Sequence, residues 1–363
     1  MNQRDVLDAL VIALTADVPV LLWGEPGVGK TASVNALADD LGWPIETVLA
    51  SLREPSDFAG LPVVIDGAMR FVAPDWAQRL AGCERGICFF DEISTAAPSV
   101  QKALLRVVHE KVVGDLRLGA GVRMVAAANP AEVASGGWDL TAPLANRFCH
   151  LDWGIDAATI ADGLAGSWPK VTALTPPDDR TSARRAAASS VAAFLRARPG
   201  LVHRRPASAE QMGRAWPSPR SWDALIRILA VADSTHVSKE VRTALLVGLV
   251  GDGAAAEFLA FSKGPDLPDP ENLIARPARY QRPDRDDQVH AIVGAVVDAV
   301  IARPTPRRWE RGVEVLVRVA EQGNLDIAAN GVRRIAAHRP SGAAVPESLE
   351  VFGEILQQIG ALA

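Results

Sequence analysis

The fold is decided by one stretch of the chain, PVLLWGEPGVGKT at residues 19–31. Its first five residues are an apolar run, which predicts a short buried strand. The next eight fit the pattern G-x-x-x-x-G-K-[ST], whose glycines let backbone N–H groups curl around phosphate oxygens. We therefore expect a phosphate-binding loop made of Gly24, Glu25, Pro26, Gly27, Val28, Gly29, Lys30 and Thr31.

Two side chains of this loop carry the chemistry. Lys30 is expected to reach the β- and γ-phosphates of a nucleotide, and Thr31 is expected to ligate Mg²⁺. A chance glycine-rich turn would also match the pattern, but here an apolar strand precedes the loop and a helix over residues 31–41 follows it. Residues 44–50 predict a second strand. Strand, glycine loop, helix and strand are the beginning of a parallel α/β sheet.

A second motif ends in two acids. Ile87-Cys88-Phe89-Phe90 is a continuous apolar run typical of a central strand covered on both faces, and Asp91 and Glu92 follow it. We expect Asp91 to bind Mg²⁺ through its water shell and Glu92 to orient and polarise the attacking water. A solvated acidic turn is the alternative, but the carboxyl ends of strands are where parallel sheets bind ligands.

Two β-hairpins are also predicted. Asp66-Gly67 separates two apolar runs in residues 63–72, and this pair favours the tight turn of a hairpin. Residues 112–118 and 122–128 are expected to pair around Gly119-Ala120-Gly121, with the second arm entering the sheet. Helices are expected over residues 2–16, 75–81 and 98–109.

From about Asp156 onward strand signals become sparse and helical patterns dominate. Residues 263–270 are rich in proline and predict a linker. Helices are expected near residues 287–302, 307–322, 324–338 and 346–360. We therefore expect an α/β nucleotide-binding domain at residues 1–153, a helical lid at 154–262 and an additional C-terminal helical domain at 271–363.

Composition limits the class of function. The 363 residues carry a net charge of −5, so no overall basic field favours a nucleic-acid partner. Three cysteines without paired spacing argue against a disulfide framework and fit a reducing cytoplasm. Asp8, Asp17 and Pro19 interrupt the apolar segment 6–23, so that segment predicts no membrane span. We expect a soluble, cytoplasmic protein.

Together these motifs resemble the AAA+ ATPases, which have a P-loop NTPase fold, and in detail they resemble the MoxR branch. The resemblance implies ATP and Mg²⁺ as cofactors. Neither the N-K-x-D motif of GTPases nor the L-S-G-G-Q signature of ABC ATPases occurs in the chain. The resemblance also implies that Asn129, which ends the strand after the acidic motif, senses the γ-phosphate. The two hairpins match this branch's helix-2 insert and the hairpin before its sensor strand.

The resemblance assigns further roles to arginines. In this family an arginine from the neighbouring subunit completes the site, and Arg147 in Leu144-Ala145-Asn146-Arg147-Phe148 matches that motif. Arg106, on the preceding helix, is a rival candidate for the same role. The family has a second sensor arginine in its lid, and Pro217-Ser218-Pro219-Arg220-Ser221 is similar to the lid motif, which points to Arg220.

For the whole protein the resemblance implies a ring, in this family a hexamer, that couples hydrolysis to the remodelling of a client protein. Such a chaperone-type protein often acts beside a partner with a von Willebrand factor A-like domain. Two other classes stay open: a DNA-acting AAA+ protein of the initiator or clamp-loader type, and an ATP-regulated scaffold without turnover. The mildly acidic balance argues against the first, and intact Asp91, Glu92 and Arg147 argue against the second.

Overall fold

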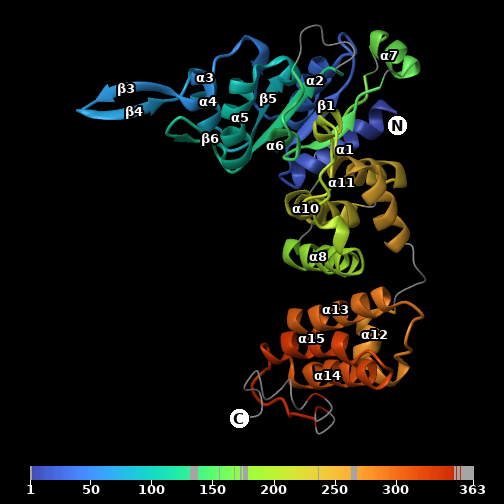
Figure 1. Cartoon of the computed structure of the whole chain (residues 1–363). Coiled ribbons are helices and arrows are strands. Elements are labelled where there is room, and N and C mark those ends of the chain that lie inside the picture. Colours follow the sequence, from blue (N-terminus) through green and yellow to red (C-terminus); the bar gives the residue numbers. More distant parts are fainter. Residues whose placement is uncertain are drawn as a thin grey trace. The chain divides into compact units, whose positions relative to one another are not determined.

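The computed structural model describes residues 2–130, 138–154, 156–166, 168–171, 174, 179–235, 237–262, 268–346, 349 and 352. The chain divides into two compact units, whose helices and strands are labelled in Figure 1. Unit 1 comprises Met1–Asp178 and Leu201–Ala256, and unit 2 comprises Asp179–Gly200 and Glu257–Ala363.

A five-stranded parallel sheet forms the centre of unit 1, with the strand order β2-β5-β8-β1-β9. The three inner strands are buried along almost their whole length, which explains why their sequences are continuous apolar runs. The predicted α/β fold class is confirmed. The strands are β1 (Val20–Trp23), β2 (Ile45–Leu49), β5 (Gly86–Asp91), β8 (Val122–Ala128) and β9 (Cys149–Asp152).

Local signals set the ends of the helices in unit 1. Asn2 and Asp5 form a reciprocal capping box at the first helix, and Gly42 ends the second in the left-handed conformation. The helices of this unit are α1 (Gln3–Thr15), α2 (Lys30–Leu41), α3 (Ser56–Ala59), α4 (Asp75–Ala81), α5 (Pro98–Glu110), α6 (Ala142–Ala145), α7 (Ala157–Leu164), α9 (Ala209–Met212) and α10 (Pro219–Thr235).

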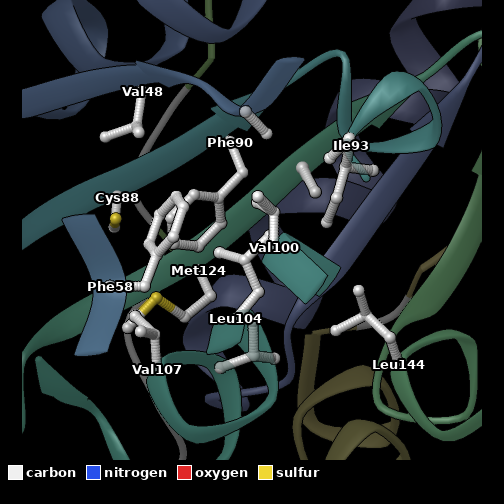
Figure 2. Packing of buried hydrophobic residues seen from close by; sticks show 14 of the residues in the cluster. Val48, Phe58, Cys88, Phe90, Ile93, Val100, Leu104, Val107, Met124 and Leu144 are labelled. Atoms are coloured by element: carbon white, nitrogen blue, oxygen red, sulfur yellow. The ribbon is translucent and has the colours of Figure 1, made fainter. Parts of the chain in front are cut away.

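The hydrophobic core beside β5 holds the acidic motif in place. Figure 2 shows Phe58 and Phe90 packed together with Val100, Leu104 and other buried apolar side chains. The rings of Phe58 and Phe90 meet edge to face with centroids 6.1 Å apart. Phe90 precedes Asp91 and Ile93 follows Glu92, and both apolar residues are fully buried. The two acids are therefore held between residues that cannot leave the core without exposing large apolar surface.

The first predicted hairpin is confirmed. β3 (Leu61–Ile65) pairs with β4 (Ala68–Val72), and both Asp66 and Gly67 have positive φ at the turn between them. The hairpin projects away from the sheet of unit 1 as a two-stranded ribbon (Figure 1). At its base a Cβ on Gly114 would lie 2.3 Å from the Phe71 carbonyl oxygen, so only glycine allows the backbones to approach this closely.

The second hairpin differs from the prediction. β6 (Val112–Val113) pairs with β7 (Leu116–Arg117), and the turn lies at Gly114-Asp115 instead of residues 119–121. β8 does enter the sheet as expected, but it pairs in parallel with β5 on one edge and β1 on the other. Because both of its edges are occupied, residues 112–118 cannot pair with it.

Unit 2 is helical and has its own core. Its helices are α8 (Arg180–Ala197), α12 (Pro270–Ala275), α13 (Asp286–Ala302), α14 (Pro306–Glu321) and α15 (Leu325–Ala336), and α11 (Lys239–Ser262) begins in unit 1 and ends here. The helices predicted near 287–302, 307–322 and 324–338 are confirmed as α13, α14 and α15. Most of the helix predicted at 346–360, and most of the predicted linker, lie outside the described residues.

The two units do not coincide with the three predicted domains. α8, which falls in the expected lid, belongs to unit 2, where Phe194 packs edge to face on Phe258 and Phe261. The boundary between the two units depends on apolar packing between segments that are far apart in the sequence. The composition along the chain does not reveal that boundary. As a statement about independently folding domains, the three-part division stays a prediction.

One helix in the described ranges, α11, is long and apolar enough to span a bilayer by length and composition alone. Non-helical backbone at Gly251 interrupts it, and Leu245, Leu246 and Phe258 are buried in the protein. The core helix of a globular protein passes the same test, so this helix is weak evidence for a membrane span.

Candidate active site

Three neighbouring strands deliver the predicted residues to one edge of the sheet. β1 runs into the phosphate loop at Gly24, β5 ends at Asp91, and β8 is followed by Asn129. β8 lies between the other two, with Ala128 opposite Trp23 and Ala126 opposite Phe90. Their carboxyl ends therefore converge, as the doubly wound topology requires of a ligand site.

The phosphate loop has the backbone that its glycines predict. Gly27 and Gly29 adopt positive φ values of 81° and 88°, which non-glycine residues rarely adopt. Lys30 follows as the first residue of α2 and is buried. Its Nζ donates to the carbonyl oxygens of Gly24 and Glu25 at 2.6 and 2.9 Å. The ammonium thus stays within the curve of the loop, where phosphate oxygens would lie.

Burial acts on this ammonium. Desolvation lowers the pKa of Lys30, while the nearby carboxylates of Asp91 and Glu92 raise it. An ammonium that has lost hydration and bonds mainly to neutral carbonyl oxygens gains strongly from an anionic ligand.

The predicted magnesium ligands touch each other. Thr31 Oγ1 donates to Asp91 Oδ2 at 2.6 Å, so a hydroxyl oxygen and a carboxylate oxygen lie side by side at the loop. Oxygen donors of this kind fit Mg²⁺, which takes one or two protein ligands together with phosphate oxygens and waters. No cluster of three or more His, Cys, Asp or Glu side chains suited to a metal occurs in the described ranges.

Glu92 is held in an uncommon conformation. Its φ of 54° is in the left-handed region, and non-glycine residues with such backbones concentrate at functional sites. Its carboxylate accepts a hydrogen bond from Ser51 Oγ at 2.7 Å, and its backbone N–H donates to Asp91 Oδ1 at 2.9 Å. Sequence reasoning missed Ser51. The available signal was its place just after β2, the strand that pairs with β5.

Asn129 lies directly after the end of β8. Its Oδ1 accepts from Lys30 Nζ at 2.9 Å, and its backbone N–H donates to Ser94 Oγ at 3.2 Å. The side-chain amide Nδ2 is a donor suited to a phosphate oxygen. The structure thus brings Asn129 into direct contact with the phosphate loop.

An apolar pocket of about 220 Å³ adjoins the loop at Val28 and Gly29. Trp153 and Trp168 line it, and Trp153 Nε1 donates to the Val28 carbonyl oxygen at 3.1 Å. The remaining lining comes from the start of α1, one side of α2, Ile160 of α7, and Pro169 and Val171. The position of the two tryptophans beside a phosphate loop suits a flat nucleotide base.

Arg147 bonds within its own segment of the chain. Arg147 follows the short helix α6 and donates through Nη1 to the Pro143 carbonyl oxygen. Burial lowers the pKa of Arg147, and the positive charge of Arg220 lowers it further. In the described part of the chain, its Nε is buried without a hydrogen-bond partner. The charge of Arg220, expected to be a lid sensor, therefore acts on Arg147.

Arg106, the rival of Arg147, has local partners. It pairs with Glu110 at 3.4 Å along α5, and its Nη1 donates to the Gly114 carbonyl oxygen at 3.1 Å. Both ions of this pair are about half exposed, so the pair itself contributes little to stability. The contact with Gly114 directs Arg106 toward the base of the β3–β4 hairpin.

Comparisons with known proteins agree with this geometry. Residues 19–148 match the model of the AAA domain of the dynein-related subfamily. The chain is 32% identical over 111 residues to the uncharacterised protein YeaC of Bacillus subtilis, covering 30% of this chain and 33% of that protein. It is also 32% identical over 114 residues to the protein MoxR of Methylorubrum extorquens, covering 31% and 33%. The match to the chain therefore spans about a third of these relatives' length.

Among solved structures, a crystal structure from Cytophaga hutchinsonii, described provisionally as an ATPase, aligns with 73% of this chain and 90% of its own. Its sequence identity is 19% and its TM-score 0.45, too low to support an argument about function. The resemblance of the phosphate loop and acidic motif to AAA+ proteins, including MoxR, is confirmed over the matched segment.

Proposed function

Because residues 19–148 match the model of the AAA domain of the dynein-related subfamily, we propose that this chain binds ATP with Mg²⁺ and hydrolyses it to ADP and phosphate. One observation carries the proposal. Lys30 contacts Asn129, and Thr31 contacts Asp91, through direct side-chain hydrogen bonds at the carboxyl edge of the sheet. Residues from three strand ends thereby meet at one loop that can hold phosphates.

Each of these residues has a distinct part in the reaction. Lys30 brings a positive charge to the β- and γ-phosphates, while Thr31 and Asp91 hold the cation. Mg²⁺, when bound, neutralises negative charge on the phosphate oxygens. Glu92 accepts a proton as water attacks the γ-phosphorus and the bond to the β-phosphate oxygen breaks. Asn129 donates its amide to a γ-phosphate oxygen.

The base occupies the pocket beside Val28 in this proposal. A purine stacked near Trp153 and Trp168 leaves its sugar and phosphates at the loop, because Gly29 lines the pocket and also belongs to the loop. The lining is mainly apolar, as in most small-molecule sites. This arrangement gives affinity for the base without requiring a charged residue.

Two arginines complete the site of a neighbouring copy. Arg147 has a buried Nε without a hydrogen-bond partner among the described residues, and the positive charge of Arg220 acts on it. Two like charges of this kind gain from an anionic ligand. The phosphates of a second subunit supply that anion, and the arginines stabilise charge on the transferring group. We therefore propose a ring assembly, a hexamer by resemblance to the family, in which Arg147 acts on the next subunit's nucleotide.

The assembly acts on a client protein in this proposal. The β3–β4 hairpin exposes apolar side chains on a projecting ribbon, with Leu61, Val64 and Met69 each at least 60% exposed. Exposed apolar surface of this kind marks interaction sites. We propose a chaperone-type, protein-remodelling role in the cytoplasm. A partner with a von Willebrand factor A-like domain is a candidate, named by the resemblance alone.

Phosphate release from Mg-ATP by the purified full-length chain tests the proposal. Specific activity should rise with protein concentration, because single subunits lack the arginine of a neighbour. Lys30→Ala subunits keep Arg147, and Arg147→Ala subunits keep the phosphate site, so mixing these two inactive variants should recover activity.

A silent mixture, with co-assembly shown by light scattering, would mean that Arg147 does not act on a neighbour. Arg106 would then be the next candidate. Absence of phosphate release at every concentration would favour an ATP-regulated scaffold, and salt-dependent DNA binding would favour the DNA-acting class.

A further inference from the structure

Asn146, the residue directly before Arg147, belongs to a buried hydrogen-bond network. The sequence motifs contain these residues but do not predict the bonds between them. We infer that Asn146, with Ser218 and Ser221, is a positioning junction that holds Arg147 and Arg220 as one fixed pair. The inference rests on the proposed function, because it concerns how the arginine pair is presented to a neighbouring nucleotide. It assigns a role to three residues that do not themselves touch phosphate.

Asn146 uses both ends of its amide. Its Nδ2 donates to the Trp216 carbonyl oxygen at 3.1 Å, and its Oδ1 accepts from Ser218 Oγ at 2.6 Å. Ser221 Oγ donates to the same Trp216 carbonyl at 3.1 Å and accepts from the Ser218 backbone N–H at 2.8 Å. Asn146, Ser218 and Ser221 are at most 6% exposed. The network therefore joins the end of α6 to the start of α10 in a place that water does not reach.

Each arginine is attached to this network at its backbone. Asn146 is the C-terminal cap of α6, and Arg147 is the next residue. Arg220 is the second residue of α10 and lies between Ser218 and Ser221. Movement of one arginine's backbone relative to the other breaks the hydrogen bonds that join Asn146 to Ser218 Oγ and to the Trp216 carbonyl oxygen. A broken bond here leaves a buried polar group unsatisfied, which disfavours such a movement.

The like charges explain why such a junction is useful. Arg220 lowers the pKa of Arg147, so the two guanidinium groups repel each other when no anion lies between them. Flexible side chains on separate segments would move apart, and each would then have to be brought back when a phosphate arrives. A rigid backbone junction keeps the pair preorganised for negative charge.

Removal of the Asn146 side chain should leave the chain folded. The Trp216 carbonyl keeps its hydrogen bond from Ser221 Oγ, and Ser218 Oγ keeps its bond with the Ser221 backbone N–H at 3.1 Å. Asn146→Ala therefore removes the hydrogen bonds that connect the segment of Arg147 to the segment of Arg220. The Trp216 carbonyl oxygen still has a hydrogen-bond partner. Ser218→Ala removes the Asn146–Ser218 hydrogen bond from the other side and leaves the bond from Asn146 Nδ2 to the Trp216 carbonyl oxygen.

The test places the same substitution first in one and then in the other of the two subunits that meet at a boundary. In mixtures of Lys30→Ala with Arg147→Ala, only the Lys30→Ala subunit donates an arginine to a working site. Asn146→Ala added to that donor should lower the recovered rate of phosphate release by at least roughly tenfold. The same substitution added to the Arg147→Ala subunit has no Arg147 to position, so the rate should stay that of the parent mixture.

Ser218→Ala, tested in the same two mixtures, should also lower the recovered rate only when it is placed in the Lys30→Ala subunit. Ser234→Ala on α10 is the matched control and should leave the rate unchanged in both mixtures. KM for ATP should stay constant while the maximal rate falls, because the acceptor's phosphate loop is intact. Equal losses in both arms for both substitutions, or no loss in the donor, would overturn the inference while the proposed function stands. A parent mixture without activity would overturn the proposed trans-acting arginine and this inference with it.

Discussion

Lys30 Nζ lies 2.9 Å from Asn129 Oδ1, a hydrogen bond between residues 99 positions apart in the chain. This hydrogen bond joins the phosphate loop to the end of β8. The ammonium expected to meet the phosphates is therefore in contact with the amide expected to sense them. A nucleotide that draws Lys30 toward its phosphates must alter the partner of Asn129. The two residues therefore respond to the same ligand.

Lys30→Ala should abolish ATP binding. The ammonium is the one positive group within the curve of the loop among the contacts described above, and it bonds there to the carbonyl oxygens of Gly24 and Glu25. Calorimetry with Mg-ATP measures the loss. Asn129→Ala is the matched control, since it removes the amide but leaves the ammonium, and it should retain binding while turnover falls. Unchanged affinity in Lys30→Ala would contradict the assignment of the loop.

Glu92→Gln should bind ATP and lose turnover by about two orders of magnitude or more. Glutamine keeps the size of the side chain and can still accept from Ser51 Oγ, but it cannot take the proton of the attacking water. Single-turnover hydrolysis and equilibrium binding, measured on the same preparation, separate the two effects. Near-normal hydrolysis would show that another residue orients the water. The variant is also suited to retaining a client in a pull-down.

Ser51→Ala should lower kcat by roughly tenfold and leave KM for ATP unchanged. The Ser51 hydroxyl bonds to Glu92 Oε2 at 2.7 Å, and no other side-chain bond to that carboxylate occurs among the described residues. Ser51→Thr, which keeps the hydroxyl, should restore most of the rate. An equal loss in both variants would mean that packing at this position matters and the hydrogen bond does not.

Trp168→Ala should weaken nucleotide affinity with little change in the rate at saturation. Trp168 lines the pocket beside the loop and packs so closely on α7 that a Cβ on Gly163 would lie 2.3 Å from its ring. Loss of one stacking partner corresponds to about 1–3 kcal/mol for a base on an aromatic ring. Trp43→Ala, outside the pocket, is the control. Equal affinities for ATP in Trp168→Ala and the unsubstituted chain would exclude this pocket as the base site.

Acid should destabilise the fold through His150. Burial lowers the pKa of His150 to about 4 from its ordinary 6.5. Between these values the unfolded chain binds a proton that the folded chain does not, so the free energy of unfolding falls as pH drops from about 6.5 to about 4. The slope is at most about 1.4 kcal/mol per pH unit.

Urea unfolding at several pH values measures this slope. His150→Gln should remove its share of the pH dependence, whereas His109→Gln, an exposed site on α5, should not. Identical slopes in the unsubstituted chain and His150→Gln would show that His150 is not held neutral. The hydrogen bond from Trp23 Nε1 to His150 Nδ1, at 2.9 Å, is consistent with the neutral form.

Local sequence predicted the elements that depend on short-range chemistry. The phosphate loop, the strand before the two acids and the Asp66-Gly67 turn were readable because glycine conformations and apolar runs act within a few residues. The second hairpin was misplaced, since two turn signals lay close together. The choice between Gly114-Asp115 and residues 119–121 depended on β8 having partners on both edges.

The sequence by itself determined that this chain has a parallel α/β sheet with a phosphate loop and an acidic strand end, because those patterns encode their own backbone. Only the tertiary structure decided that Ser51 reaches Glu92, that Trp168 lines a pocket beside the loop, and that the charge of Arg220 acts on Arg147. These contacts join segments distant in the chain, and the packing of strands and helices sets such distances. Residue type and spacing along the sequence carry no measure of them.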